Sequence, residues 1–284
     1  MEVHAPDQTP FFEWREAPAM NYAVLGDPVA HSLSPRMHAA AMAASDIDAT
    51  YLAVRVPAGE LEEALVHLHS QGCVGVNCTI PLKAEAREWA HSRGGLVGWE
   101  LDSFPGASVN TLNLESQQGI STDEPGFMKT IQSFGLKPCP VIVLGAGGSA
   151  QAIVPRLIRD GFEVRAWGRT LSKWLDFRAA SALDFEIVQK PEVSGCELII
   201  NATSTGLTGE RLDLDWSEAP KSALAYDLAY TTGLTPFLAE ASGRGLKVMD
   251  GRPLLVEQGA LSFEWWHGIM APRNEMRRAI LGNS

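Results

Sequence analysis

Cysteine is scarce in this sequence: there are four cysteines among 284 residues, and no two of them form a C-x-x-C pair. A fold held by disulfides or by a cysteine-rich zinc site is therefore excluded, and a reducing, cytoplasmic location fits better. No histidine has clustered partners at ligand spacing, so we predict no metal site.

Long apolar runs and excess basic charge are also missing. No stretch approaches the roughly 18 apolar residues of a membrane-spanning helix, and the first ten residues lack both parts of a signal peptide. Lysine and arginine number 23 against 34 acidic residues, a formal net charge of −11. This balance argues against nucleic-acid or anionic-membrane partners, although a local basic pocket for a small anion remains possible.

What the chain does contain is an alternation of short apolar runs with amphipathic stretches, which is typical of an α/β protein. Its length favours two domains. We expect residues 1–20 to be a loose extension, 21–121 to form one domain and 122–250 a second. The last residues, from Arg252, read as helical, with Trp265, Trp266 and Ile269 expected to be buried.

The predicted strands fall in both domains. Expected are Tyr22–Leu25, Thr50–Val56, Gly75–Thr79, Val141–Leu144, Glu163–Trp167, Phe185–Val188, Leu198–Ala202, Ala223–Leu228 and Lys247–Met249. A less periodic stretch of the first domain ends in Ser108–Leu114. Between them, helices are expected at about Pro35–Ala44 and Gly59–Ser70, and in a short stretch that contains Lys83.

A glycine-rich loop follows the apolar strand Val141–Leu144 and opens a helix. It matches G-x-G-x-x-A and consists of Gly145, Ala146, Gly147, Gly148, Ser149 and Ala150. The first glycine permits a tight turn, the second lets the backbone approach a pyrophosphate, and the helix N-terminus supplies N–H groups to the anion. Pattern and context together predict a dinucleotide site.

The end of the next predicted strand indicates which dinucleotide. An NAD site usually has an acidic residue roughly 20 positions after the loop, to bind the ribose hydroxyls. Here Arg169 and Thr170 follow the strand, with Lys173 close behind. Because a guanidinium binds a 2′-phosphate through two parallel hydrogen bonds, we predict NADP rather than NAD.

Polar residues gather at the predicted element ends of the first domain. Ser34 is a good N-cap before Pro35, and Ser32 adds a second hydroxyl that could help to hold a carboxylate. Asn77 and Thr79 alternate along an extended segment and so point to the same side. Lys83 and Asp123 could form a cation–carboxylate couple at a reacting hydroxyl.

With these residues in place, the chain resembles the shikimate dehydrogenase family from Tyr22 to about Trp266. The resemblance rests on ordered motifs: Ser-Leu-Ser-Pro at 32–35, Gly-Val-Asn-Cys-Thr-Ile-Pro-Leu-Lys at 75–83, Val-Asn-Thr at 109–111, Thr-Asp at 122–123, the glycine loop, Gly-Arg-Thr at 168–170, Asn-Ala-Thr-Ser at 201–204, Asp-Leu-Ala-Tyr at 227–230 and Gly-Arg-Pro-Leu-Leu-Val-Glu-Gln-Gly at 251–259. Ser121 and Gly168 stand where the family usually has asparagine.

The resemblance implies a two-domain α/β fold and NADPH-dependent reduction of 3-dehydroshikimate to shikimate, in aromatic amino-acid biosynthesis. Residues 21–121, with the C-terminal helices at about 251–284, would bind the substrate, and 122–250 would form a Rossmann-like NADP-binding domain. It leaves monomer or homodimer open.

The same resemblance assigns roles by position. Lys83 and Asp123 would be the catalytic pair. The other substrate-binding residues would be Ser32, Ser34, Asn77, Thr79, Asn110, Tyr230 and Gln258. Beyond the glycine loop, the cofactor would be bound by Arg169, Thr170, Lys173, Asn201, Ala202, Thr203, Ser204, Leu228, Gly251 and Leu254.

Two other functions remain open. A quinate/shikimate dehydrogenase that prefers NAD has a similar sequence, although the serine pair and Arg169 favour shikimate and NADP. A non-catalytic sensor of dinucleotide or shikimate is the alternative of another class, but Lys83 and Asp123 are both present and no DNA-binding helix pair accompanies them.

Overall fold

The structure is a computed structural model that describes residues 9–98 and 108–281. The chain divides into two compact units. The first contains the described residues up to Gly126 together with those from Leu255 onward, and the second is Phe127–Leu254. Both are α/β, as predicted.

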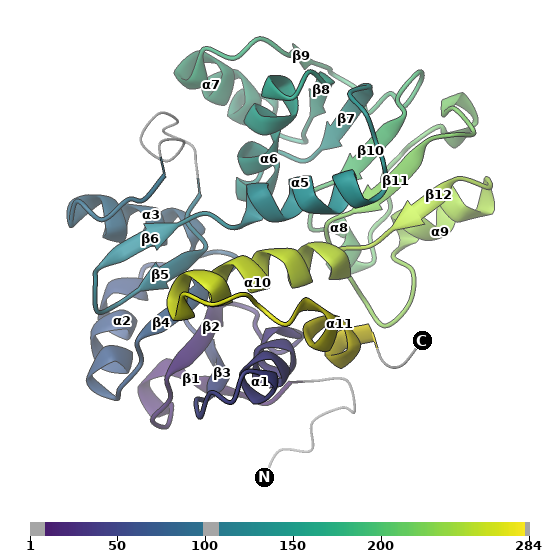
Figure 1. The fold of residues 1–284 in the computed structure, drawn as a ribbon. Helices are drawn as coiled ribbons and strands as arrows, with labels where there is room; N and C mark the ends of the chain where they lie inside the picture. Colours follow the sequence, from purple (N-terminus) through teal and green to yellow (C-terminus); the bar gives the residue numbers. More distant parts are fainter. Residues whose placement is uncertain (1–8, 99–107, 282–284) are drawn as a thin grey trace. The chain divides into compact units, whose positions relative to one another are not determined.

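The first unit is built on a six-stranded sheet (Figure 1). In sheet order the strands are β1 (Phe11–Glu13), β3 (Tyr51–Arg55), β2 (Tyr22–Gly26), β4 (Gly75–Cys78), β5 (Thr111–Asn113) and β6 (Gln118–Ile120). The first four are parallel because helices return the chain between them, whereas β5 and β6 are antiparallel. The parallel register pairs Tyr22 with both Tyr51 and Gly75.

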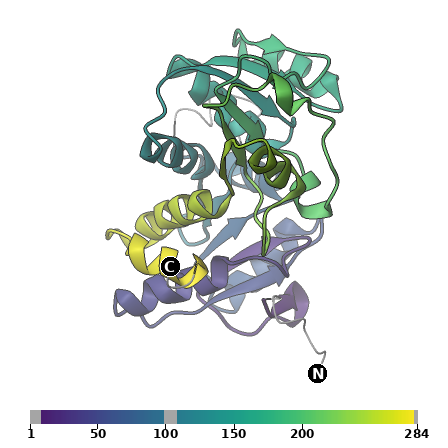
Figure 2. The same ribbon diagram turned by 90° about the vertical axis from the view of Figure 1, so that its right-hand side faces the viewer.

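Helices cover both faces of this sheet. They are α1 (Ser34–Ala44), α2 (Leu61–Ser70), α3 (Lys83–Ser92), the start of α5 (Asp123–Ser133), most of α10 (Arg252–His267) and α11 (Arg273–Leu281). On one face Leu61, Leu65 and Leu68 of α2 are buried against the strands, as their spacing predicts. On the other face α11 packs beside α1, as Figure 1 and Figure 2 both show.

Three predictions for the first unit were wrong. Residues 9–20 are no loose extension, because β1 pairs with β3 and a 3₁₀ turn (Trp14–Glu16) buries Trp14; residues 1–8 lie outside the described range. Ile269 follows α10 and is 46% exposed, and Trp265 and Trp266 are only partly buried, whereas Phe263, one turn before the end of that helix, is fully buried. Ser34 is the first residue of α1 rather than its cap.

The second unit contains a six-stranded sheet in which every pair is parallel. Its order is β12 (Lys247–Met249), β11 (Leu224–Asp227), β10 (Leu198–Asn201), β7 (Pro140–Leu144), β8 (Glu163–Trp167) and β9 (Glu186–Ile187). The chain runs outward from β7 to one edge and then from β10 to the other. The loop after β7 therefore lies where the strand order reverses, which is the usual ligand position in doubly wound sheets.

The central strands β7, β10 and β11 of the second unit are buried along nearly their whole length because helices cover both faces of the sheet. The helices are the rest of α5, α6 (Gly148–Arg159), α7 (Leu171–Ser181), α8 (Thr205–Thr208), the 3₁₀ turn Trp216–Glu218 and α9 (Pro236–Gly243). Along β7, Val141 and Val143 face one core while Ile142 and Leu144 face the other. This explains the unbroken apolar run from which the strand was predicted.

No helix in the described ranges combines the length and the apolar character needed to cross a bilayer.

Candidate active site

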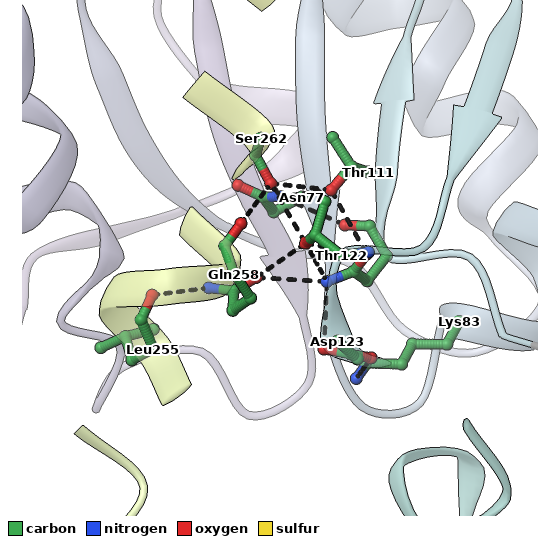
Figure 3. Close-up of polar contacts among 9 residues, drawn as sticks. Asn77, Lys83, Thr111, Thr122, Asp123, Leu255, Gln258 and Ser262 are labelled. Carbon is green, nitrogen blue, oxygen red and sulfur yellow. Dashed lines mark hydrogen bonds and ion pairs between the residues drawn. The ribbon is translucent and has the colours of Figure 1, made fainter. Parts of the chain in front are cut away.

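Lys83 and Asp123 form an ion pair in the first unit (Figure 3). Each begins a helix, α3 and α5 respectively, and Lys83 Nζ lies 2.5 Å from Asp123 Oδ2. Their side chains are only 15% and 11% exposed, so water screens the pair weakly. The carboxylate is thus held beside an ammonium group that can donate a proton.

Asn110 connects this ion pair to α10. Its amide Nδ2 lies 3.1 Å from Asp123 Oδ1, 3.1 Å from Gln258 Oε1 and 2.9 Å from Thr122 Oγ1. Its Oδ1 accepts the backbone N–H of Thr122 at 2.8 Å, which fixes the orientation of the amide. The start of α5 and one turn of α10 are therefore joined by a single buried amide, which stands just before β5.

Asn77 extends the same network from β4. Its Nδ2 lies within 3.2 Å of Asn110 O, Thr111 Oγ1 and Ser262 Oγ, and its Oδ1 accepts from the Tyr51 hydroxyl at 2.7 Å. Ser262 Oγ also lies 2.8 Å from Thr111 Oγ1 and 3.4 Å from Thr122 Oγ1 (Figure 3). The structure thus gathers five predicted site residues in one network: Asn77, Lys83, Asn110, Asp123 and Gln258.

Sequence analysis missed four members of this network: Tyr51, Thr111, Thr122 and Ser262. Thr111 and Thr122 lie in the quoted motifs, next to Asn110 and Asp123, and could have been included for that reason. Ser262 could not, because it stands 185 residues from Asn77 in sequence and follows Gln258 by one helical turn.

Four further residues were predicted to bind the substrate: Ser32, Ser34, Thr79 and Tyr230. Ser34 is buried, and its backbone N–H donates to Ser32 Oγ at 3.3 Å, so Ser32 rather than Ser34 receives a bond at the start of α1. Thr79 follows β4 and donates its N–H to Leu25 O. Tyr230 belongs to the second unit. Their roles toward a substrate stay predictions.

The glycine loop of the second unit has the geometry of an anion site. Gly145 has φ of +116°, and a Cβ there would lie 2.7 Å from Ala202 O, so only glycine fits. A Cβ on Gly147 would meet nothing within 4 Å, and Gly147 precedes α6 without a side-chain cap. Ala150 is fully buried, as close helix–strand packing requires. These residues fit a pyrophosphate group.

Arg169, Thr170 and Lys173 are exposed at the start of α7, where Thr170 is the residue before the helix. Arg169 is 67% exposed and lies 3.7 Å from Glu210, itself 57% exposed. Such a pair contributes at most about 1 kcal/mol, so it does not hold Arg169 away from a phosphate group. Gly168 is buried, and a Cβ there would lie 3.0 Å from the Cβ of Ala146 in the glycine loop.

A buried polar cluster lies where β10 and β11 end. Asn201 Nδ2 donates to Asp227 Oδ2 at 3.0 Å, and Asn201 Oδ1 accepts from Thr203 Oγ1 at 2.6 Å. Burial raises the pKa of Asp227, while hydrogen bonds from Thr235, Ala229 N–H and Asn201 act against that rise. The Asn201 side chain thus braces two strand ends, a structural task that its sequence motif does not reveal.

The remaining predicted cofactor residues lie in the same unit. Ala202, Thr203 and Ser204 follow β10, and Leu254 packs partly buried against the core. A Cβ on Gly251 would lie 2.1 Å from Leu228 O, so any other residue would displace the Leu228 backbone. Within the described parts of the chain, no group of three or more His, Cys, Asp or Glu residues is arranged to hold a metal ion.

Comparison with known proteins agrees with this geometry. The sequence profile described as "Shikimate dehydrogenase substrate binding domain" matches residues 24–93, and "Shikimate 5'-dehydrogenase C-terminal domain" matches 251–281. Shikimate dehydrogenase (NADP(+)) of Nitrosopumilus maritimus is 33% identical over 92% of this chain and 98% of its own length.

Solved structures agree as well. Shikimate dehydrogenase of Aquifex aeolicus superposes with a TM-score of 0.82 at 30% identity, over 93% of this chain and 98% of that one. The Thermus thermophilus enzyme, solved with NADP(H) and shikimate, has a TM-score of 0.80 at 34% identity, over 92% and 98%. With full-length relatives above 30% identity and the same motifs in the same order, this chain belongs to the shikimate dehydrogenase family.

Proposed function

We propose that this protein is an NADP-dependent shikimate dehydrogenase, which reduces 3-dehydroshikimate to shikimate in aromatic amino-acid biosynthesis. The observation that carries the proposal is the Lys83–Asp123 ion pair, buried and linked through Asn110 to Gln258. A chain that only sensed its ligand would need no ammonium group held at a reacting oxygen.

The first unit binds the ring. Asn77, Asn110, Asp123 and Gln258 offer amide and carboxylate groups from β4, the segment before β5, α5 and α10, and Thr79 adds a hydroxyl. Such groups hydrogen-bond ring hydroxyls. Ser32 and Ser34, at the start of α1, bind the substrate carboxylate, since hydroxyls near a helix N-terminus favour an anion.

Lys83 handles the proton. During reduction it donates a proton to the oxygen of the ring carbonyl, or positions the water that does so, and Asp123 holds the ammonium group in place. Because both side chains are nearly buried, competing water weakens the electrostatic attraction between them only a little.

The second unit holds the cofactor. NADPH, when bound, supplies the hydride. The glycine loop of residues 145–150 binds the pyrophosphate, and Arg169, Thr170 and Lys173 bind the 2′-phosphate. The segment 201–204, together with Leu228, Gly251 and Leu254, borders the nicotinamide half. The open space over Gly147 supports the first assignment, and the exposed Arg169 supports the second. Cytoplasmic location and a monomeric or homodimeric state stay predictions.

The test is a set of parallel assays with the purified full chain. Absorbance at the NADPH band would be followed with shikimate or quinate, each with NADP and with NAD. We expect rapid NADP-linked oxidation of shikimate and little reaction in the other three mixtures. Rapid NAD-linked oxidation of quinate would instead assign the protein to the dual class. Tight NADP binding without turnover of either acid would refute the enzymatic proposal and favour the sensor.

A further inference from the structure

The Asn77 amide has only one possible orientation. Its amide group lies 3.2 Å from the backbone oxygen of Asn110, and a carbonyl oxygen can only accept a hydrogen bond. The Nδ2 end therefore faces Asn110. Two further acceptors, Thr111 Oγ1 at 3.0 Å and Ser262 Oγ at 2.9 Å, surround the same nitrogen. An amide has two N–H groups, so these neighbours use both of them.

The other end of Asn77 retains unused capacity. Oδ1 accepts one hydrogen bond, from the Tyr51 hydroxyl at 2.7 Å, whereas an amide oxygen can accept two. Asn77 is 5% exposed. Toward a ligand, this side chain can therefore act as an acceptor and has no hydrogen left to donate.

Tyr51 is held in place by packing. It lies on β3, two strands from β4, so its hydroxyl reaches past β2 to Asn77. Its ring is stacked on that of His38 at 4.3 Å with an interplanar angle of 3°. His38 is fully buried, and neither of its ring nitrogens has a hydrogen-bond partner among the described residues. His38 thus supports the tyrosine ring by contact alone.

Ser262 fixes the opposite side of the Asn77 amide. Its hydroxyl is fully buried and lies 3.1 Å from Gln258 O, one turn earlier in α10, which accepts its hydrogen. With that hydrogen used, Ser262 Oγ can accept from Asn77 Nδ2. A fully buried hydroxyl cannot touch the substrate itself.

We propose that Tyr51 and Ser262 are positioning residues that hold Asn77 as a pure hydrogen-bond acceptor, so that the site requires a donating hydroxyl on the substrate at that point. The proposal rests on the proposed function and deepens it. A site of this kind rejects an analogue that lacks the hydroxyl, because the buried acceptor is left unpaired.

The central experiment compares Tyr51→Phe with Tyr22→Phe. Tyr22 is the register partner of Tyr51 on the next strand and faces the same core, but no hydrogen bond of its hydroxyl is found in the described structure. We expect Tyr51→Phe to raise KM for shikimate about fivefold, the value of one hydrogen bond, and to change kcat and KM for NADP less. Tyr22→Phe should leave all three unchanged.

A purely structural role of Tyr51 would not affect selectivity, so shikimate analogues that each lack one ring hydroxyl provide the second readout. Wild-type kcat/KM should fall more than about tenfold for one analogue, and this penalty should shrink to about threefold in Tyr51→Phe. Penalties for the other analogues should stay unchanged. Ser262→Ala removes one of the three acceptors around Asn77 Nδ2 and so loosens the hold on the amide. It should reduce the same penalty, and it replaces Tyr51→Phe if that variant does not fold.

Two failures can be told apart. If the wild-type protein oxidises shikimate but Tyr51→Phe behaves like Tyr22→Phe in both readouts, the positioning proposal is overturned and the proposed function stands. If the wild-type protein oxidises no shikimate, the proposed function has failed first and the positioning proposal falls with it.

Discussion

In the proposed mechanism Lys83 transfers the proton, and its substitution should separate catalysis from binding. Lys83→Met keeps most of the apolar stem but removes the ammonium group that lies 2.5 Å from Asp123. We expect kcat for shikimate oxidation to fall by about 10²- to 10⁴-fold, the usual contribution of a positioned proton donor. Steady-state kinetics with NADP, and cofactor binding followed by fluorescence, would measure the two effects separately.

Lys129→Met is the matched control, since Lys129 is an exposed lysine of α5. It should retain wild-type kinetics. Turnover by Lys83→Met within about threefold of wild type, far from the expected loss for a proton donor, would contradict the assignment.

Part of this site was predicted from the sequence. Asn110, Asp123 and Gln258 were predicted as site residues, and the structure joins them through one amide. Tyr51 and Ser262 were not predicted, because the sequence pattern indicates ordinary core positions of a strand and a helix there. Their importance comes from hydrogen bonds between segments far apart in sequence, which no local pattern records.

Among the elements, the turn between β7 and α6 can be tested with two glycines. Gly147→Ala has open space and an ordinary φ, so the free protein should unfold at the same temperature as wild type. Its methyl group would, however, stand where the backbone must approach the pyrophosphate, so the Kd for NADP should rise about tenfold or more. Calorimetry of melting and of binding would measure both.

Gly145→Ala should behave in the opposite way. Its backbone has positive φ, and the new methyl group would lie 2.7 Å from Ala202 O. The melting temperature should therefore fall by several degrees. Equal melting temperatures for the two alanine variants would show that the turn is less constrained than described.

The strand β1 was not predicted from the sequence. Three residues are too few to show an alternating pattern, and their burial depends on pairing with β3. A strand such as β7 was predictable because it is a run of apolar residues bounded by turn residues. The strand Glu163–Trp167 has the predicted limits.

Trp14→Ala tests whether this N-terminal element is part of the folded unit. Trp14 is 6% exposed, packs in the core beside α2 and donates from Nε1 to Glu60 at 2.8 Å. Its removal should lower the free energy of unfolding by about 3 kcal/mol. Denaturant titration would measure this loss, and Arg15→Ala, at a 61% exposed side chain, should stay within about 1 kcal/mol of wild type. A much smaller loss of unfolding free energy in Trp14→Ala would show that residues 9–20 stabilise the first unit little, as expected of a loose extension.

Acid should weaken the whole molecule through His38. Burial lowers the pKa of His38 to about 3, helped by the charge of His267. An unfolded histidine titrates near 6.5, so below that pH the unfolded chain binds a proton that the folded chain refuses. Stability is therefore lost as pH falls from about 6.5 toward 3, by about 2 kcal/mol at pH 5.

Urea titrations at pH 7 and pH 5 would measure this dependence. His38→Phe keeps an aromatic ring beside Tyr51 and removes the titration, so its loss of stability between the two pH values should be smaller by that amount. His91→Gln, at an exposed histidine of α3, should keep the wild-type dependence. An unchanged dependence in His38→Phe would assign the acid sensitivity elsewhere.

The division of the whole molecule was harder to place from the sequence than its elements were. We predicted changes of domain at 121/122 and at about 250/251, whereas the compact units meet along the chain at 126/127 and at 254/255. Both positions lie inside helices, α5 and α10. Because helical periodicity continues through them, no composition shift or linker marks the boundary. Which unit binds which ligand stays part of the proposed function.

The return of residues 255–281 to the first unit has a consequence for the order of synthesis. One of its two cores contains Val256, Ala260, Phe263, Met276 and Ile280 beside residues from the first sixty of the chain. On the ribosome, β2 and β3 emerge long before these partners exist, while Phe127–Leu254 is complete in one continuous stretch. The first unit can therefore complete its fold only after the second unit has been synthesised. Until α10 and α11 emerge, Tyr22, Tyr51 and Met37 lack the residues of those helices against which they pack in the folded unit.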